Sequence, residues 1–474
     1  MIGEIQNIWW RGTVQNHWIE DYKSQITDQI SKYKWIVAID ILVAAGFLGQ
    51  SLRKYGAKEI FLLSGNQGTG NIDESFPHIN LNISASKGLM EGIYAIEDGF
   101  QNLSAEHLAR LDEFDPTQEA KVMVSLFGSS KPIAGRQVFG ARHSSWMELE
   151  DKLIVDALWD EVGIPRQPAL ILSLKDPEFW TKCQSIDQGD GVVLAGDNRD
   201  GWHGGATRIR IVKTPEQSQQ AQNFLSQHCD KVRVMPFLEG IPCSIHGWVF
   251  PGEVVSLRPC EMLVLHNEDE GSFVYCGVGT SWKPTAEIEM QMKDNAVKVG
   301  KYLQEKYGYR GCFTMDGVAT KEGFFPTELN PRFGGAMGRI QQSIPDVPLY
   351  LLHLCTIADV LSHHYPQEFA KTLIQNVDEK PYVSGMYTLV GTSISDSTEY
   401  WIACDNDQWQ MVDQSYPNSC QVKLGPNPSG GLLWILIHPS YLGYGQAGAG
   451  LLLSALQFLS AELNLPLPRL KSAI

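Results

Sequence analysis

The residues whose types best suit chemistry are two carboxylates and an amide, Asp316, Glu328 and Asn330. They lie in GCFTMDGVATKEGFFPTELNPRFGGAMGR (residues 311–339), which predicts two short strands joined by a tight turn and followed by a glycine-rich loop. Side chains two apart on a strand share a face, so Glu328 and Asn330 project together. Carboxylates that oppose each other on a sheet repel, and a hard cation such as Mg²⁺ resolves that repulsion while keeping waters for substrate phosphates. The pattern therefore predicts a magnesium site on this hairpin.

The register of the hairpin decides whether these oxygens meet. We expect Gly323 to take the left-handed position of a three-residue hairpin loop. In that register Thr320 faces Phe324. Further along the same two strands, Asp316 faces Glu328, and the two carboxylates come together.

Two neighbouring residues bear on the same site. Pro326 cannot donate to a strand ladder, so it indicates an edge strand or a bulge. A one-residue slip there would move Asp316 off the site. Arg332 follows closely, and its planar guanidinium could reach the same phosphates or a carboxylate. The alternative is an acidic hairpin whose charges only face solvent.

The composition limits the classes of partner. The chain has 474 residues, enough for two to four domains, with 43% hydrophobic and 19% charged residues, as in a soluble globular protein. Its net charge of −16 argues against a nucleic-acid surface or an anionic membrane as the main partner. Nine scattered cysteines without a CxxC pair favour reduced thiols in a cytosol. The N-terminal residues show no signal pattern, and the apolar segment Leu451–Leu463 is too short to span a bilayer, so we expect a cytoplasmic protein.

The first part of the chain predicts an α/β unit. Trp35–Asp40 is typical of a buried strand, and a glycine turn, a helix and the strand Glu59–Leu63 should follow. Gly46 and Gly49 could let a phosphate approach a helix N-terminus, but the fingerprint is incomplete, and a tight strand–helix turn is the favoured alternative. This incompleteness disfavours a dinucleotide-dependent oxidoreductase. The loop Ser64–Gly70 is either a substrate loop or a linker.

A helix with apolar spacing from Leu149 to Leu158 is predicted next, ended by Gly163–Pro165. Lys152 lies at its expected start, where a helix dipole would help to hold an anion; a solvated surface lysine is the alternative.

A glycine-rich loop between two predicted strands follows at residues 197–205. Such loops let backbone N–H groups wrap phosphates, although ordinary hairpin loops are also rich in glycine. A strand then runs from Val232 into the turn 236–240. The loop contains the basic and small residues Arg199, Gly201, His203, Gly204 and Gly205.

These segments, taken in order, resemble the ATP-grasp superfamily. The resemblance rests on LEDK…GIP, the glycine-rich loop, the hinge RVMPFLEG and the stretch that ends in NPRFGG, over residues 145–340. The layout is most similar to the carboxylate–amine, peptide-ligase-like branch. It implies an α/β protein with α+β subdomains: a Rossmann-like pre-ATP-grasp domain at 1–140, an ATP-grasp domain at 141–370 with its lid at about 166–237, and a small α+β domain at 371–474.

The resemblance implies that ATP lies between two subdomains, one of which is a hinged lid. Lys152 then contacts the ATP phosphates, and Arg332 lies near the transferred phosphate and the acyl group. Backbone groups of Met235 and Leu238 hold the adenine. The implied metal ligands are Asp316, Glu328 and Asn330, and the implied nucleotide contacts are Lys152, Arg199, Gly201, His203, Gly204, Gly205, Met235, Phe237, Leu238 and Glu239.

The sequence departs from the family pattern at two places. A second phosphate-binding lysine, common at the end of the lid strand, falls on Ala195–Gly196; Arg199 or His203 is the hypothesised substitute. The acidic residue that often binds the ribose falls near Pro242, and Glu239 is the nearest replacement.

The implied reaction is phosphoryl transfer from ATP to a carboxylate, followed by attack of an amine on the acyl phosphate. The expected cofactors are ATP and Mg²⁺, with Mn²⁺ as an alternative metal, and the expected substrates are small amino-acid or peptide-like acids and amines. We expect no nucleic acid and no membrane as partner; a homodimer is left open. The alternatives are an ATP-grasp small-molecule kinase and a non-catalytic ATP-binding regulatory protein. The acid and amine should bind where the first domain meets the core, with Arg142, His143 and Asn66–Gly70 as candidates and plain surface positions as the alternative.

Overall fold

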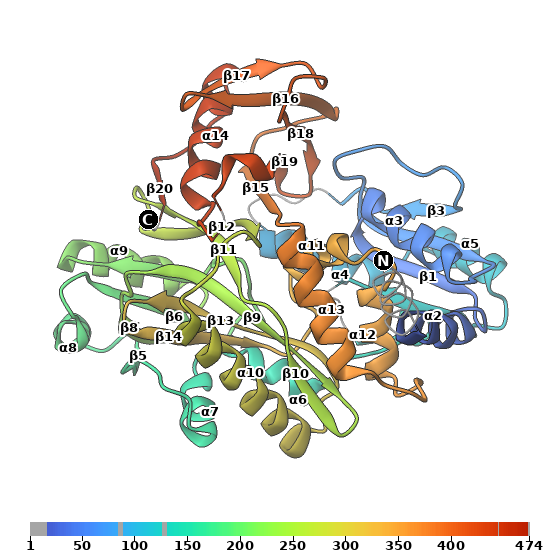
Figure 1. Cartoon of the computed structure of the whole chain (residues 1–474), viewed down its shortest axis with the longest axis horizontal. Coiled ribbons are helices and arrows are strands. Elements are labelled where there is room, and N and C mark those ends of the chain that lie inside the picture. The colour runs from blue at the N-terminus through green and yellow to red at the C-terminus, as the bar shows by residue number, and fades with distance from the viewer. Residues whose placement is uncertain (1–16, 84–88, 126–129, 444, 473–474) are drawn as a thin grey trace, which may run out of the picture.

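A computed structural model describes residues 17–83, 89–125, 130–443 and 445–472. The predicted absence of a signal segment falls mostly on residues 1–16 and lies outside the described residues. Figure 1 shows a parallel sheet near the N-terminus, a large antiparallel sheet through the middle, and a C-terminal unit above both. The domain boundaries expected from the sequence stay predictions.

The N-terminal unit is a parallel sheet in the order β3-β2-β1-β4. Its central strands read as continuous apolar runs because helices cover both faces. The strands are β1 (Trp35–Ile41), β2 (Ile60–Asn66), β3 (His78–Asn80) and β4 (Lys121–Val124), and the helices are α2 (His17–Ile30), α3 (Leu42–Lys54), α4 (Leu89–Gln101) and α5 (Ala105–Phe114).

Gly46 and Gly49 lie inside α3, because this helix begins directly after β1 without a glycine turn. Both are buried, and a Cβ on Gly49 would meet the Phe76 ring at 3.0 Å. The expected glycine turn was therefore wrong: these glycines allow close packing in the middle of a helix.

The middle of the chain forms a lid sheet and a core sheet. The lid strands pair in the order β5-β8-β6-β7, and β7 joins the core through the pair Arg210 and Ser272. The lid strands are β5 (Leu170–Ser173), β6 (Val192–Gly196), β7 (Ile209–Val212) and β8 (Lys231–Pro236). The core strands are β9 (Ile241–Phe250), β10 (Glu253–Ser256), β11 (Cys260–Asn267), β12 (Ser272–Gly279), β13 (Gly311–Thr320) and β14 (Gly323–Asn330), with β20 (Leu470–Ser472) added at β11.

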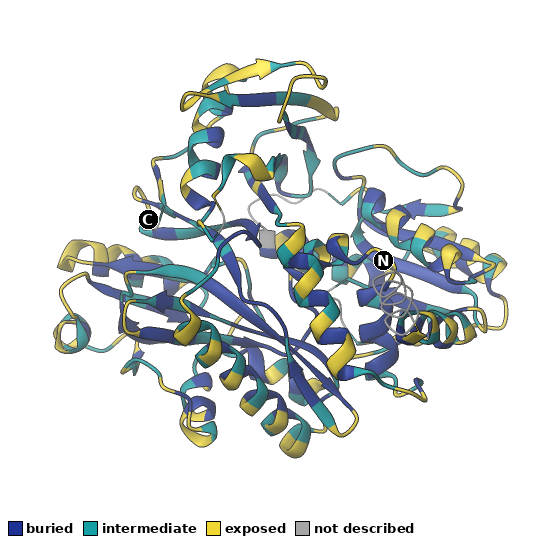
Figure 2. Ribbon diagram, in the orientation of Figure 1, coloured by how far each residue is buried: buried dark blue, intermediate teal, exposed yellow. Residues whose placement is uncertain are grey.

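Helices cover these sheets. One face of the lid packs against α8 (Phe179–Ile186) and α9 (Pro215–Leu225), and the long α10 (Ala286–Tyr307) packs against the core strands. Figure 2 shows the strands dark where they run beneath these helices. Shorter helices precede and follow the core: α6 (Ser144–Met147), η1 (Glu148–Glu150), α7 (Val155–Val162), α11 (Met337–Ser343), α12 (Leu349–Ile357) and α13 (Pro366–Glu379).

The C-terminal unit continues the same sheet through β15, which pairs with β12. Glu261 of the core holds the N-terminal end of the helix of this unit. Its buried carboxylate accepts hydrogen bonds from the Gly448 and Ala449 N–H groups at 2.6 and 3.0 Å. The expected strands and helix in this unit are confirmed. Its elements are β15 (Val383–Val390), β16 (Thr398–Asp405), β17 (Gln408–Val412), β18 (Cys420–Asn427), β19 (Gly430–Ile437), η2 (Pro439–Tyr441) and α14 (Ala449–Glu462).

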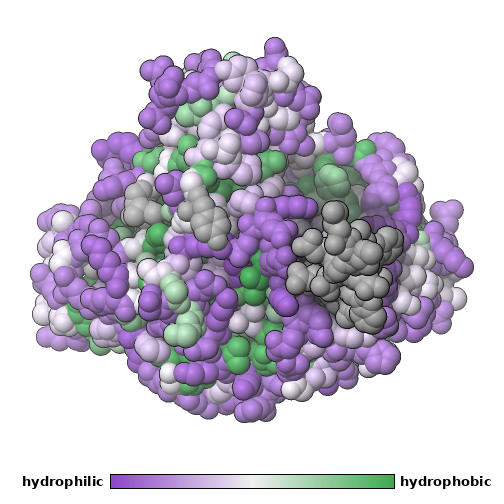
Figure 3. All heavy atoms as spheres, viewed as in Figure 1, coloured by the Kyte–Doolittle hydropathy of each residue, from purple (hydrophilic) through white to green (hydrophobic). Residues whose placement is uncertain are grey.

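The visible surface in Figure 3 is mainly hydrophilic, with scattered hydrophobic residues between the units. Within the described ranges, no helix is long and apolar enough to cross a membrane.

Candidate functional site

The hairpin of β13 and β14 brings Asp316 directly opposite Glu328, as predicted. The turn differs from the expectation: Thr320 pairs with Gly323, so the loop has two residues rather than three. Thr320 therefore does not face Phe324, and this part of the predicted register was wrong.

A bulge restores the register before the carboxylates. Gly317 pairs with Pro326 and Asp316 pairs with Glu328, so Thr327 is the extra residue on β14. Pro326 thus lies beside an irregularity on an edge strand, as its missing N–H requires. One residue fewer in the turn is compensated by one residue more in the bulge.

Three adjacent strands place six polar side chains on one face of the core sheet. Directly opposed residues of an antiparallel pair share a face, and so do residues two apart on one strand. Across β9, β13 and β14 the pairs form two rows: His246, Thr314 and Asn330, then Ser244, Asp316 and Glu328.

The polar side chains of the site contact one another directly. The Asn330 Nδ2 donates to Asp316 Oδ2 at 2.8 Å, and Lys152 Nζ lies 3.0 Å from Glu328 Oε1. Burial, followed by the charge of Glu328, raises the pKa of Asp316 to about 7. Two opposed carboxylates, one of them costly to ionise, fit a divalent cation, whose charge would offset both effects. Within the described ranges, no group of three or more His, Cys, Asp and Glu side chains could hold a metal, and the candidate donors here are two carboxylates and the Asn330 amide.

Lys152 reaches the site from a turn rather than from a helix start. The expected helix is divided into α6, η1 and α7, and α7 begins only at Val155. Lys152 is buried, and its charge is held by Glu328 rather than by a helix dipole. Ile154, expected on the apolar face, is exposed.

Arg332 and Arg142 share a buried carboxylate, Glu150. Arg332 Nε lies 3.2 Å from one oxygen and Arg142 Nη1 lies 2.5 Å from the other. Although burial raises it, the pKa of Glu150 is held below its usual range by the two guanidinium groups. Arg332 Nη2 also donates to Asn330 Oδ1 at 2.9 Å, which ties this cluster to the metal-binding face. The sequence reasoning missed Glu150.

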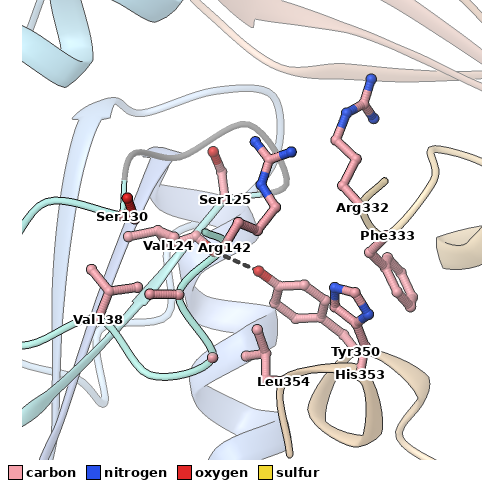
Figure 4. A pocket seen from close by; sticks show the side chains of 12 residues that line it. Val124, Ser125, Ser130, Val138, Arg142, Arg332, Phe333, Tyr350, His353 and Leu354 are labelled. Atoms are coloured by element: carbon pink, nitrogen blue, oxygen red, sulfur yellow. Dashed lines mark hydrogen bonds between the residues drawn. The ribbon is translucent and has the colours of Figure 1, made fainter. Parts of the chain in front are cut away.

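These arginines line a hollow where the N-terminal unit meets the core. In Figure 4 both arginines extend in the same direction, with Tyr350 and His353 on the far side of the hollow from their guanidinium groups. The Tyr350 hydroxyl donates to the Val124 carbonyl at 2.6 Å and so joins the two units. The sequence carried no signal for Tyr350 or His353.

The other candidates for this junction lie elsewhere. His143 caps α6, where its Nδ1 accepts the Ser145 N–H. In the loop 66–70, the Thr69 hydroxyl donates to the Pro426 carbonyl and the Gly70 N–H donates to the Ser397 hydroxyl, so the loop packs against the C-terminal unit.

The glycine-rich loop closes over the site. The Trp202 ring lies 5.7 Å from the Arg332 guanidinium, and the Gly204 N–H contacts Met90 Sδ of α4 at 3.3 Å. Gly201 and Gly205 have φ of 88° and 62°, which glycine adopts without strain. His203 is buried, with Nε2 3.0 Å from the Gly196 carbonyl oxygen, and burial, aided by the charge of Lys152, lowers its pKa to about 3.

Two arginines of the lid have different surroundings. Arg199 is exposed and contacts Asp200, Asp230 and carbonyls that follow α9, so it faces away from the metal-binding face. Arg233 is buried and lies opposite Ala195 in the β6–β8 ladder. Its Nε and Nη2 each donate to Asp156 at 2.7 Å.

Arg233 lies on the lid face that α8 and α9 leave uncovered. The apolar cluster under those helices contains Leu194, Val232 and Val234, which point the other way from Ala195 and Arg233. Arg233 Nη1 contacts Met235 Sδ, a weak acceptor. The sequence reasoning missed this residue.

The backbone groups of the hinge residues 235–238 differ in whether they already have a hydrogen-bond partner. The Phe237 N–H donates to the Gly191 carbonyl at 2.8 Å, and Met235 pairs with Val193, so both are engaged by β6. Among the described residues no hydrogen bond occupies the Leu238 N–H, which can donate to an adenine nitrogen. Phe237 stacks on Phe273, with 6.5 Å between the ring centres, and Glu239 is exposed.

Comparison with known proteins finds no matching family profile and no curated protein with similar sequence, whereas many solved structures share the fold. One is the biotin carboxylase domain of 2-oxoglutarate carboxylase from Hydrogenobacter thermophilus, with MgADP, ADP and bicarbonate (14% identity, 86% of each chain, TM-score 0.52). Another is carboxyaminoimidazole ribonucleotide synthase from Aspergillus clavatus with ATP (12% identity, 91% of this chain and 99% of that one, TM-score 0.53). A third is L-amino acid ligase from Bacillus licheniformis (13% identity, 91% and 97%, TM-score 0.50). Together with the parallel N-terminal sheet and the lid-and-core architecture, these likenesses identify the fold: the chain has the ATP-grasp fold.

Proposed function

We propose that the protein is an ATP-dependent carboxylate–amine ligase that forms an amide bond through an acyl phosphate and releases ADP and phosphate. The observation that carries this proposal is the convergence of Asp316, Glu328, Lys152 and Arg332 beneath the glycine-rich loop. The structural neighbours support it, since one is an L-amino acid ligase and others are complexes with ATP or MgADP. We expect amino acids or small peptide-like molecules as substrates.

The cofactors we propose are ATP and Mg²⁺, with Mn²⁺ as an alternative. Asp316, Glu328 and Asn330 would hold the metal, which neutralises phosphate charge when bound. Lys152 contacts Glu328, one of these proposed metal ligands, and so lies close enough to contact the phosphates as well. Arg332, fixed by Glu150 and Asn330, presents a planar guanidinium to the developing charge on the transferred group.

The hollow lined by Arg142 and Arg332 is our candidate site for the acid and the amine. It adjoins the metal-binding face through Arg332 and has both charged and apolar walls. Trp202 and His203 cover this region, so the loop must lift to admit ATP and would then exclude water from an acyl phosphate.

A screen for ADP release tests the proposal. Amino acids and carboxylates are supplied singly and in pairs with Mg-ATP, and products are identified by mass spectrometry. A ligase releases free phosphate only when acid and amine are both present. ADP formation with one phosphorylated substrate would instead indicate the small-molecule kinase, and tight ATP binding without turnover on any pair would indicate a regulatory protein.

The lid arginines give a second prediction. We expect Arg199→Ala to leave the KM for ATP and kcat within about twofold, because Arg199 binds the end of α9. We propose that Arg233, which lies opposite Ala195, contacts the phosphates in place of the missing lysine. Arg233→Ala should therefore raise the KM for ATP roughly tenfold or more, because that charge-assisted hydrogen bond would be lost. His203 is neutral near pH 7, since burial and the charge of Lys152 lower its pKa to about 3, so it cannot supply a positive charge there.

Steady-state kinetics of the two variants at saturating acid and amine measures these effects. Equal and small effects in both variants would show that Arg233 does not contribute to nucleotide binding. A large effect of Arg199→Ala alone would restore the hypothesis that Arg199 replaces the missing lysine.

Location and assembly remain expectations. All nine cysteines are unpaired and only Cys404 is not buried, which supports a cytoplasmic protein. The biotin carboxylase domain cited above is described as a dimer, and light scattering would test a homodimer of this chain.

A further inference from the structure

His203 of the glycine-rich loop has one ring nitrogen that the proposed mechanism does not use. The side chain is buried, and its Nε2 lies 3.0 Å from the carbonyl oxygen of Gly196, the last residue of β6. A carbonyl oxygen only accepts hydrogen bonds, so Nε2 carries the hydrogen of the neutral imidazole. Nδ1 is therefore a hydrogen-bond acceptor, and a contact within the lid fixes this tautomer.

This acceptor is buried without a donor. Among the residues that the structure describes, no hydrogen bond reaches Nδ1 of His203. Burial, followed by the charge of Lys152, lowers the pKa of His203 to about 3, so the ring stays neutral and Nδ1 keeps its lone pair. Buried polar atoms are nearly always hydrogen-bonded, because an unsatisfied one is unfavourable. A donor is therefore expected when the site is occupied.

Two cationic side chains lie close enough to His203 to lower its pKa, Lys152 and Arg208. The Arg208 guanidinium already donates to three backbone carbonyls of the glycine-rich loop. Lys152 has three N–H donors and, within the described part of the chain, a single acceptor, Oε1 of Glu328. Lys152 is thus the cation with donors to spare for Nδ1.

We propose that His203 is a positioning residue: when the glycine-rich loop closes on a nucleotide, Nδ1 of His203 accepts a hydrogen bond from Lys152 Nζ. The ammonium is then held between Glu328 of the core and His203 of the lid, and its third N–H is directed at a phosphate. Closure of the loop and placement of the lysine are coupled in this way. The inference rests on the proposed function, because it requires Lys152 to contact nucleotide phosphates.

The test measures binding of adenylyl imidodiphosphate, a non-hydrolysable ATP analogue, with Mg²⁺ by calorimetry, so it needs no turnover. His203→Gln keeps an amide nitrogen that can donate to the Gly196 carbonyl, but it loses the Nδ1 acceptor. We expect the Kd of the analogue to rise roughly tenfold or more, as for loss of a hydrogen bond to a charged group. A histidine that only tethers the loop to Gly196 would instead leave the Kd of this variant unchanged.

A double-mutant cycle shows whether His203 acts through the lysine. Lys152→Met keeps an unbranched side chain without the ammonium, and it should weaken binding of the analogue by itself. In that background His203→Gln should change the Kd by less than about twofold, because no ammonium is left to position. An equal loss in both backgrounds, or no loss in the otherwise wild-type protein, would overturn the proposal.

His228→Gln is the matched control, since His228 lies on the same lid with a partly exposed side chain. It should bind the analogue like the wild-type protein, and thermal unfolding verifies that each variant is folded.

The outcomes separate this inference from the ligase function. If the cycle shows the coupling but no pair of acid and amine yields ADP, the ligase function fails and the role of His203 stands. If ligation occurs but the cycle is additive, only the role of His203 fails. Absence of binding of the analogue to the wild-type protein would overturn the nucleotide site and this proposal together.

Discussion

Glu328→Ala is expected to abolish ADP formation while leaving the fold intact. Glu328 is directly opposite Asp316 and forms the ion pair with Lys152, so its loss removes a proposed metal ligand and releases the lysine from its position. Because charge neutralisation and positioning dominate phosphoryl transfer, we expect kcat to fall by at least about 10²–10³-fold. Glu328 lies on an edge strand and is partly exposed, so the core does not depend on it.

The measurement is ADP release as a function of Mg²⁺ concentration, with circular dichroism to confirm folding. Glu328→Gln keeps the shape but removes the charge, and it should also require more Mg²⁺. Glu322→Ala is the matched control, since Glu322 is exposed in the turn of the same hairpin. Near-wild-type ADP formation by Glu328→Ala would contradict the metal assignment.

Arg332→Lys is expected to lower kcat by roughly 10²–10³-fold with little change in the KM for ATP. The guanidinium contacts Glu150 and Asn330 at once, and a lysine ammonium cannot reproduce this planar arrangement. Both partners are buried, so a misplaced charge at this position also disturbs the metal-binding face. The positive charge is conserved, and the effect therefore reports geometry.

Single-turnover measurement of ADP formation isolates the chemical step for this variant. Arg310→Lys makes the same substitution just before β13, where Arg310 contacts the partly exposed Asp359. We expect that control to behave like the wild-type protein. A fall in ATP affinity with unchanged kcat in Arg332→Lys would instead assign the arginine to nucleotide binding.

Local patterns were sufficient to predict the hairpin and its cluster. Alternation along two short strands and a glycine turn placed Asp316 opposite Glu328, although Pro326 threatened that register, and the structure confirms the pair. The predicted turn was one residue too long, but the bulge at Thr327 shifts the register by one residue, so the predicted pair still forms. The fold class was also predicted, because the ordered strands, glycine-rich loop and hinge resemble those of a known family.

Lys152 shows where local prediction ends. Its contribution to the site was anticipated, but the helix expected around it is interrupted, and its real partner lies far along the chain at Glu328. Arg199 lies in the glycine-rich loop that was expected to bind phosphate. Its side chain nevertheless turns toward the end of α9, where backbone carbonyl oxygens accept its hydrogen bonds.

From the sequence by itself, the spacing of neighbouring residues determined the facing of Asp316 and Glu328. The fold class was predicted through the resemblance of the ordered motifs to a known family. Only the tertiary structure decided that Glu150 joins Arg142 to Arg332 and that Arg233 lies opposite Ala195. These placements depend on which strands pair and on how segments far apart in the sequence pack together. Side-chain periodicity shows which face of an element is buried, but it does not show which distant residue that face will contact.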